Sequence, residues 1–201
     1  MIEFVNKLKD PILGWIPLTE IEDEIIRTQA FNRLQYITQM SLAYVTYSGA
    51  HHTRFEHSIG TMHISFEIAR RISELRSYFG SKFDSALQLL RLAALLHDIG
   101  HPPFSHAIEW IFKMNPSLSP IDSYSHDKYT KNIIENDEEI HDIIDQYLAG
   151  KKNAPEYRKA LSALASGEKK SLLESKSSLH KSCVVLIPIL NGDLDADKID
   201  Y

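Results

Sequence analysis

The sequence predicts an all-α protein with one short β-hairpin near its N-terminus. Apolar side chains recur at helical spacing through three long stretches, residues 55–75, 84–96 and 133–148, and through a shorter one, residues 104–111. In residues 10–18, apolar residues alternate with turn formers, which is typical of a short hairpin. Helices therefore have to supply most of the core.

The first helix has a clear start directly after the hairpin. Thr19 and Glu22 have the spacing of a capping box, in which each side chain accepts a hydrogen bond from the backbone N–H of the other residue. Phe31, Leu34 and Ile37 then follow at helical spacing. We expect these three side chains to face the core.

Length and composition limit the class of protein. The 201 residues with 43% hydrophobic content are enough for one core and predict a single domain over residues 1–201. A net charge of −5 argues against a nucleic-acid binder that uses its whole surface. Because there is no signal-peptide pattern and no apolar run of membrane-spanning length, we expect a cytoplasmic protein without a membrane partner. The single Cys183 cannot form an internal disulfide and is expected to be buried.

Residues 150–182 differ in composition from the rest of the chain. They hold seven lysines and one arginine against three glutamates, with serines throughout, and carry a local charge of +5. One interpretation is a contact with phosphate or nucleic acid. The other, which we favour, is a solvated and mobile basic insertion.

A chemically distinctive motif lies at the end of the most apolar predicted helix. His97 and Asp98 follow a run of leucines and alanines, and Gly100 with two prolines then stops the helix, because proline cannot continue one. Neighbouring residues differ by about 100° around a helix axis, so an imidazole and a carboxylate can approach one cation from the same side. His101, four residues after His97, would share that face if the last turn persists.

A metal ion needs more than two protein ligands, and two further residues are suited to it. His57 lies in the segment RFEHSIG and Asp197 in the segment DLDADKIDY. With His97 and Asp98 they make a set of two imidazoles and two carboxylates, which suits Mn, Fe, Co, Ni, Zn or Mg and leaves room for water. A His-Asp pair alone, however, arises by chance in many chains.

The order of these residues resembles the H…HD…D motif of the HD-domain metal-dependent phosphohydrolases. Four segments, NRL, RFEHS, HDIGHPPFSH and DADKIDY, narrow the resemblance to the deoxynucleoside-triphosphate triphosphohydrolase branch. The resemblance implies a helical bundle, a nucleotide substrate, a homo-oligomer and one divalent metal ion on His57, His97, Asp98 and Asp197. It also implies hydrolysis of a (deoxy)nucleoside triphosphate to a nucleoside and intact triphosphate.

By the same resemblance, five side chains are assigned to the substrate. Arg54 matches an arginine that grips the triphosphate, and its planar guanidinium suits bidentate phosphate binding. Gln39 matches a residue that contacts the sugar 3′-hydroxyl, although an exposed helix position explains it equally well. Met40 occupies the position that crowds the 2′ carbon, where leucine is common, so selection against ribose stays open. Lys198 and Tyr201 match residues that contact phosphate and pack against the sugar.

Four more residues are implied in phosphate binding and proton transfer. His101 and His106 match histidines around the phosphates, where a second ion, Mg²⁺, would also bind; the alternative for both is a helix-end histidine bonded to a carbonyl. His126 matches a histidine that handles the proton, and Glu109 would orient it and raise its basicity. Asp127 departs from the family pattern, which has a glutamate that is one methylene longer.

The family pattern also extends past the DADKIDY segment. Relatives continue that segment into several more helices, so we expect residues 1–201 to be the N-terminal catalytic part of a longer protein. Asp195 and Asp200 in the segment are interpreted as supporting hydrogen-bond acceptors.

Two other functions stay open. One is an HD-type nuclease or phosphodiesterase acting on nucleic acid or cyclic nucleotides, which the basic segment 150–182 favours. The other is a non-enzymatic regulatory module that keeps its metal for stability.

Overall fold

The computed structural model describes residues 2–119, 124–147 and 154–200, and it confirms the predicted all-α class. Two strands, β1 (Asn6–Asp10) and β2 (Gly14–Leu18), pair as an antiparallel hairpin. The helices are α1 (Glu20–Ile25), α2 (Gln29–Asn32), α3 (Arg54–Arg71), α4 (Ser73–Phe79), α5 (Phe83–Leu96), α6 (His106–Met114), α7 (His126–Asn136), α8 (Glu138–Tyr147), α9 (Ala154–Ala165), α10 (Lys169–Glu174), α11 (Ser178–Ser182), α12 (Ile187–Leu190) and α13 (Ala196–Asp200). Within the described residues, no helix is both long and apolar enough to cross a membrane.

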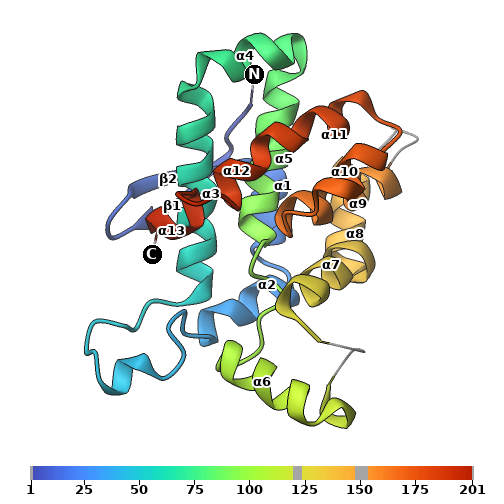
Figure 1. Cartoon of the computed structure of the whole chain (residues 1–201). Helices are drawn as coiled ribbons and strands as arrows, with labels where there is room; N and C mark the ends of the chain where they lie inside the picture. The colour runs from blue at the N-terminus through green and yellow to red at the C-terminus, as the bar shows by residue number, and fades with distance from the viewer. Residues whose placement is uncertain (1, 120–123, 148–153, 201) are drawn as a thin grey trace.

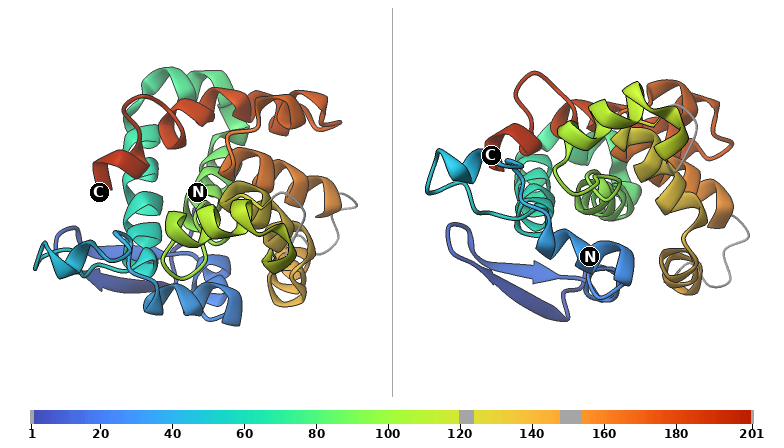
Figure 2. Two further views of the ribbon diagram at one scale, coloured as in Figure 1. Left: turned by 60° about the horizontal axis from the view of Figure 1, so that its bottom comes forward. Right: turned by 90° about the horizontal axis from the view of Figure 1, so that it is seen from below.

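Helices α3 and α5 form the centre of the molecule and run side by side (Figure 1). Every residue of α5 from Leu89 to Leu96 is buried, because leucines and alanines occupy all sides of this part of the helix around a single arginine. Seen from below, the two helices are viewed end-on, with the hairpin on one side and α8 and α9 on the other (Figure 2). Helices α12 and α13 pack across α3. Cys183 is buried, as predicted.

The N-terminal elements confirm two local predictions. The hairpin is present, although β1 begins at Asn6, before the predicted segment. The capping box of Thr19 and Glu22 is also present. Glu22 reaches further into the core, where its carboxylate accepts hydrogen bonds from Nε and Nη2 of Arg91, both 2.7 Å long. This buried ion pair attaches the N-terminal elements to α5.

Two helices end earlier than the sequence pattern suggests. The pattern through residues 55–75 forms two helices, because α3 ends at Arg71 and Ile72 is extended before α4 begins. Helix α5 ends at Leu96, and the residues after it form turns. The last helical turn therefore does not persist to His101, and turn geometry rather than a shared helix face sets the position of that side chain.

The described part of the basic segment, residues 154–182, is helical and packed, which differs from the mobile insertion expected there. Helix α9 buries Leu161 and Leu164 and packs against α5 and α7, while α10 buries Leu172 against α9. All six residues 160–165 at the end of α9 are buried, and the single lysine of this helix, Lys159, is exposed before them. The lysine and serine content of the segment gave no indication of these buried apolar positions. Residues 150–153 of the segment lie outside the described residues.

Candidate metal centre and substrate pocket

His57 lies in the first turns of α3, and both of its ring nitrogens face carboxylates. Thr53 and Glu56 form a capping box that fixes the start of this helix. The His57 side chain is fully buried, with Nε2 2.8 Å from Asp197 Oδ1 and Nδ1 2.9 Å from Asp200 Oδ2. Both carboxylates belong to α13. The packing of α13 across α3 thus brings Asp197 to His57 from the far end of the sequence.

His97 and Asp98 follow α5 in a turn. Nδ1 of His97 donates a hydrogen bond to the carbonyl of Ala94 at 2.8 Å, which leaves the lone pair on Nε2. Within the described structure, this buried Nε2 has no hydrogen-bond partner. It lies 3.4 Å from Asp98 Oδ1 and 3.6 Å from Asp197 Oδ1. A buried nitrogen among carboxylate oxygens requires a proton or a cation to satisfy it.

Three of the four predicted ligands meet around one point. Ligand atoms of His57, His97 and Asp197 all lie within 4.8 Å of one another. Asp98 is adjacent, with Oδ2 3.8 Å from His57 Nε2, and its carboxylate accepts a hydrogen bond from Arg54. Imidazole and carboxylate donors fit a divalent transition metal or Mg²⁺, so these residues could hold such an ion.

The charges of this cluster favour a positive charge at its centre. Burial opposes protonation of His57, but hydrogen bonds to Asp197 and Asp200 outweigh it and raise the pKa of His57 to about 9. Burial likewise opposes ionisation of Asp98, yet the charge of His97 and its other neighbours hold the pKa of that carboxyl well below its usual range. The carboxylates are thus ionised, as metal ligands must be, and a metal ion would take the place of the proton on His57.

A pocket of about 350 Å³ opens beside the cluster. It is lined by Gln39, Arg54, Asp98, His101, His106, His126, Asp197 and Lys198. Gln39 lies in a turn and is partly buried, so the exposed helix position considered for it is wrong. Its Oε1 atom is buried and has no hydrogen-bond partner within the described residues. That atom is therefore able to accept a hydrogen bond from a ligand.

Arg54 lines the pocket and is buried. Its Nη1 donates to Asp98, and its Nε donates to Ser105 Oγ at 2.9 Å. Phe104 and Ser105 have positive φ angles of 61° and 47°, a conformation that costs energy for residues other than glycine. This strained turn places Ser105 against Arg54 and starts α6 at His106.

The residues predicted for phosphate binding and proton transfer form one cluster. The rings of His101 and His126 are stacked, and His106 meets both edge-to-face. Glu109 accepts a hydrogen bond from the backbone N–H of His126 at 3.0 Å and lies 3.1 Å from Nδ1 of His106. Burial opposes ionisation of Glu109, but the hydrogen bonds from both histidines lower its pKa to about 2. The cluster therefore contains a fixed negative charge.

The two stacked histidines differ in their affinity for a proton. Burial lowers the pKa of His101 to about 4, so this ring is neutral at pH 7. Burial also opposes protonation of His126, but a hydrogen bond to Asp127 and the charges of Asp127 and Glu109 raise its pKa above the ordinary value. Asp127, despite being shorter than glutamate, reaches Nε2 of His126 at 3.2 Å.

Two predicted substrate residues, Met40 and Lys198, are not free side chains of the pocket. Among the described residues that line it, Met40 is not included. Lys198 reaches the pocket, but its Nζ donates to Asp195 Oδ2 and to a backbone carbonyl, both at 2.7 Å. Tyr201 lies outside the described residues. The predicted acceptor roles of Asp195 and Asp200 are confirmed, because each carboxylate accepts a hydrogen bond within the site.

Sequence reasoning missed two residues that shape the site. Arg33 donates hydrogen bonds to the carbonyl oxygens of Ile99 and His101 and so fixes the turn after the ligand pair. Gly60 faces Asp200 so closely that a side chain there would overlap the carboxylate. An arginine within the NRL segment and a glycine in a helix interior, three residues after a ligand, were the available signals.

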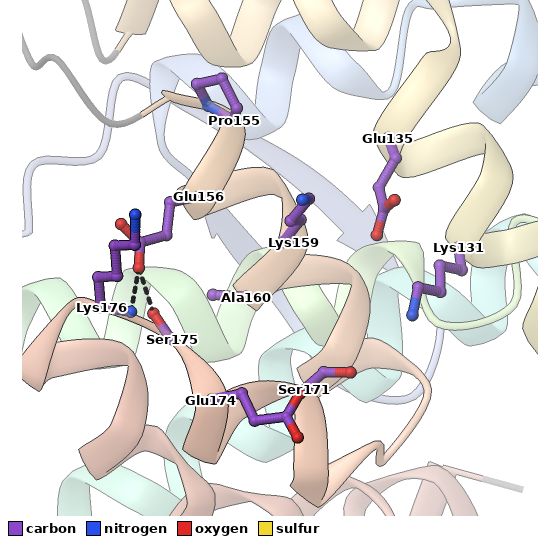
Figure 3. Close-up of a pocket in the computed structure, with 10 residues that line it drawn as sticks. All are labelled: Lys131, Glu135, Pro155, Glu156, Lys159, Ala160, Ser171, Glu174, Ser175 and Lys176. Atoms are coloured by element: carbon purple, nitrogen blue, oxygen red, sulfur yellow. Dashed lines mark hydrogen bonds between the residues drawn. The ribbon is translucent and has the colours of Figure 1, made fainter.

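Another pocket, of about 540 Å³, lies between α7, α9 and α10 in the region of the basic segment (Figure 3). Its lining contains three lysines and three glutamates, so its formal charge is balanced. Glu156 is held there by hydrogen bonds from Ser175 Oγ and from the backbone N–H of Lys176 (Figure 3). A balanced lining does not concentrate the positive charge that nucleic acid requires. The pocket therefore adds no support to a nucleic-acid contact by residues 150–182.

Comparison with known proteins agrees with the geometry of the metal centre. A family model described as "HD domain" matches residues 54–180, which is more than half of the chain. The chain belongs to the HD domain family. The match includes His57, His97 and Asp98, whereas Asp197 lies beyond its end.

Three proteins illustrate what this HD domain is similar to. An uncharacterized protein of Methanocaldococcus jannaschii is 36% identical over 96% of this chain and 32% of the relative. The deoxynucleoside triphosphate triphosphohydrolase SAMHD1 of Danio rerio is 35% identical over 62% of this chain and 20% of the relative. The crystal structure of a hypothetical protein from Aquifex aeolicus has a TM-score of 0.68 and 30% identity, covering 98% of this chain and 44% of that one. The chain thus spans less than half the length of these relatives.

Proposed function

We propose that this HD domain binds one divalent metal ion and hydrolyses phosphate esters or anhydrides, with deoxynucleoside triphosphates as its substrates and a nucleoside and triphosphate as products. The observation that carries the proposal is the convergence of His57, His97 and Asp197 beside a pocket lined by an arginine, a lysine and three histidines. The similarity to SAMHD1, whose name describes this activity, supports the choice of substrate.

The proposed metal site consists of His57, His97, Asp98 and Asp197. When bound, the ion makes a nearby water more acidic and polarises a phosphoryl oxygen. Arg54 holds the carboxylate of Asp98 in place. The donor set accepts Mn²⁺, Fe²⁺, Zn²⁺, Ni²⁺, Co²⁺ or Mg²⁺, so the ion bound in the cell depends on metal availability as well as on affinity. A second Mg²⁺ would arrive with the phosphates of the substrate.

The pocket supplies donors for a chain of phosphates. Arg54 and Lys198 bring positive charge, and His101 and His106 line the same pocket, where they are proposed to contact the phosphates. Donors fixed before the reaction stabilise charge that develops in the transition state, because they need not reorganise. Gln39 would accept a hydrogen bond from the sugar 3′-hydroxyl through its unpaired Oε1. Met40 and Tyr201 are proposed to contact the sugar.

His126 is proposed as the group that transfers the proton, and Glu109 as its partner. The backbone N–H of His126 donates to Glu109, whose carboxylate also lies 3.4 Å from Nδ1 of the same residue. This contact holds Nδ1 in its protonated form and directs Nε2 away from Glu109, and the negative charge makes the imidazole more basic. A raised pKa at His126 suits an acid that protonates a leaving group near pH 7.

The test uses the full-length protein with Mn²⁺ and, separately, dNTPs, NTPs, cyclic nucleotides and single-stranded DNA. Products are separated by ion-exchange chromatography and identified by ³¹P NMR. Nucleoside and triphosphate released from dNTPs would support the proposal. Shortened oligonucleotides or opened cyclic nucleotides would instead establish a nuclease or phosphodiesterase. A metal-loaded protein that leaves every substrate intact would overturn the enzymatic proposal and favour the regulatory module.

We also propose that the protein forms a homo-oligomer. Several large apolar side chains are exposed on the described surface, with Tyr36 87%, Val45 75%, Trp110 63% and Met114 63% accessible. Trp110 and Met114 lie one turn apart on α6, and neighbouring exposed apolar side chains often mark a contact with another protein. Light scattering coupled to size-exclusion chromatography would give the assembly mass, and a monomer at working concentration would contradict the proposal.

A further inference from the structure

The two nitrogens of His57 are held by two carboxylates of one short helix. Asp197 and Asp200 lie three residues apart on α13, and the imidazole of His57 sits between them. Nε2 lies 2.8 Å from Asp197 and Nδ1 lies 2.9 Å from Asp200. The Asp197 side faces the other ligands, whereas the Asp200 side faces away from them across the ring, so only Asp197 belongs to the group of converging ligand atoms.

A neutral imidazole carries one N–H group and one lone pair, so these two contacts cannot be alike. A lone pair on Nδ1 would face the carboxylate of Asp200 and repel it, whereas an N–H at this position makes a hydrogen bond. A metal ion bound on the Asp197 side would take the lone pair of Nε2, so the proton of a neutral His57 then belongs on Nδ1. This arrangement leaves the lone pair of Nε2 pointing toward His97 and Asp197, which is the orientation that a metal ligand needs.

The interior of α3 is shaped to admit Asp200. Gly60 lies one turn after His57, and a Cβ atom added there would lie 1.8 Å from Oδ1 and 2.5 Å from Cγ of Asp200. Glycine in a helix interior is unfavourable relative to alanine, because it loses more conformational freedom on folding. Its presence here is explained by the carboxylate that occupies the space a side chain would fill. The Asp200 side chain is only 12% exposed as a result.

We propose that Asp200 is a positioning residue of the metal centre, which fixes the tautomer and orientation of His57 from a slot made by Gly60. The inference rests on the proposed function, because it assumes that His57 binds a metal. Outer hydrogen-bond partners of ligand histidines commonly change metal affinity about 10- to 100-fold when they are removed. Asp200 is thus expected to set the affinity of the ion without touching it.

The test measures Mn²⁺ affinity directly in the full-length protein, by competition with a fluorescent chelator and without nucleotide. Asp200→Ala is expected to weaken binding about 10- to 100-fold. Asp200→Asn, which keeps an acceptor oxygen for Nδ1–H but loses the charge, should weaken binding less. Asp193→Asn removes an exposed carboxylate from the same segment and is expected to leave affinity unchanged. Circular dichroism and thermal unfolding confirm that each variant is folded.

A double-mutant cycle separates the positioning role from general damage. Gly60→Ala should weaken Mn²⁺ binding in the wild-type background, because the new Cβ expels the carboxylate. In the Asp200→Ala background, the same change should have no further effect on affinity, since the slot is then empty.

The outcomes distinguish this inference from the proposed function. If the wild type binds Mn²⁺ and Asp200→Ala binds it equally tightly, the inference is wrong and the proposed function stands. Additive losses in the cycle would also overturn it, because they would mean that Gly60 and Asp200 act separately. A wild-type protein that binds no divalent ion would overturn the metal centre and this inference together.

Discussion

The imidazole rings of His101 and His126 are stacked, with their centroids 4.2 Å apart and an angle of 14° between their planes. Burial keeps His101 neutral, whereas the carboxylates of Asp127 and Glu109 outweigh burial at His126 and raise its pKa. The neutral ring of His101 thus lies flat against the ring of His126, and the carboxylate of Glu109 lies 3.4 Å from Nδ1 of His126. The contact thus pairs a neutral imidazole with one that binds a proton more readily.

His126 is expected to be essential for the chemical step. His126→Ala should lower kcat on dNTPs about 10²- to 10⁴-fold, the usual contribution of a general acid or base. Mn²⁺ binding at the proposed metal centre should change little, because His126 is not part of the ligand group of His57, His97 and Asp197; it belongs to a second group with His106 and Glu109. His141→Ala, which replaces a histidine of α8 outside the pocket, serves as the matched control. Equal rates for both variants would remove His126 from the mechanism.

The pH dependence of kcat should report the carboxylates around His126. Burial opposes its protonation, but Asp127 and Glu109 raise its pKa, so the acid form persists to higher pH than in a free histidine. Replacing Asp127 with asparagine removes one of these charges and lowers that pKa. The basic limb of the kcat profile should then move to lower pH, as measured from steady-state rates at saturating dNTP. An unchanged limb would mean that another group controls it.

Removing the metal should abolish activity and lower stability. Dialysis against EDTA leaves the buried Nε2 of His97 without a partner among the described residues. Mn²⁺ at a concentration 100 times its Kd should restore about 2.7 kcal/mol of stability. Asp197→Asn should remove most of this gain, because Asp197 contacts both rings. Thermal unfolding with and without Mn²⁺ measures the difference. A gain of the same size in the variant would show that the ion binds elsewhere.

Gly100 is expected to be irreplaceable because it allows α7 to dock against the ligand pair. A Cβ atom there would lie 2.3 Å from the backbone nitrogen of Thr130 and 2.4 Å from the carbonyl oxygen of His126. Gly100→Ala should therefore cost about 1–3 kcal/mol, the range of overpacking, and displace His126 from the pocket. Gly49→Ala is the control, since nothing lies within 4 Å of its added Cβ. Urea unfolding of both variants gives the comparison, and equal stabilities would contradict the prediction.

The sequence predicted those parts of the site that depend on local pattern. The apolar run before His97 made α5 and its buried position foreseeable, and the RFEHS and DADKIDY segments pointed to His57 and Asp197 as partners. The position of Gln39 in a turn and the salt bridge that occupies Lys198 were not foreseeable, because both depend on how distant segments pack.

The basic segment shows why composition is a weaker guide than periodicity. Lysine and serine content suggested an insertion outside the core, yet Leu161 and Leu164 are fully buried in α9. A helix needs only one apolar face to pack, so its other positions are free to be charged. Asp200 illustrates a different limit, because its acceptor role was predicted while its partner, His57, lies 143 positions away.

The buried pair of Glu22 and Arg91 should dominate the stability of the N-terminal half. Both side chains are 0% exposed, so Glu22→Gln would leave the guanidinium of Arg91 without its counter-charge in the core. Loss of one partner of a buried pair typically costs about 3–5 kcal/mol. The urea unfolding free energy should fall by that amount.

A double variant tests whether the cost comes from the unpaired charge. In Glu22→Gln/Arg91→Met no charge is left in the core, so part of the lost stability should return. Arg27→Ala is the surface control, because Arg27 pairs with Asp23 at 3.0 Å while 68% of its side chain is exposed, and its loss should cost less than about 1 kcal/mol. If Glu22→Gln cost no more than Arg27→Ala, the core at this point would have to contain water that screens the charge of Arg91.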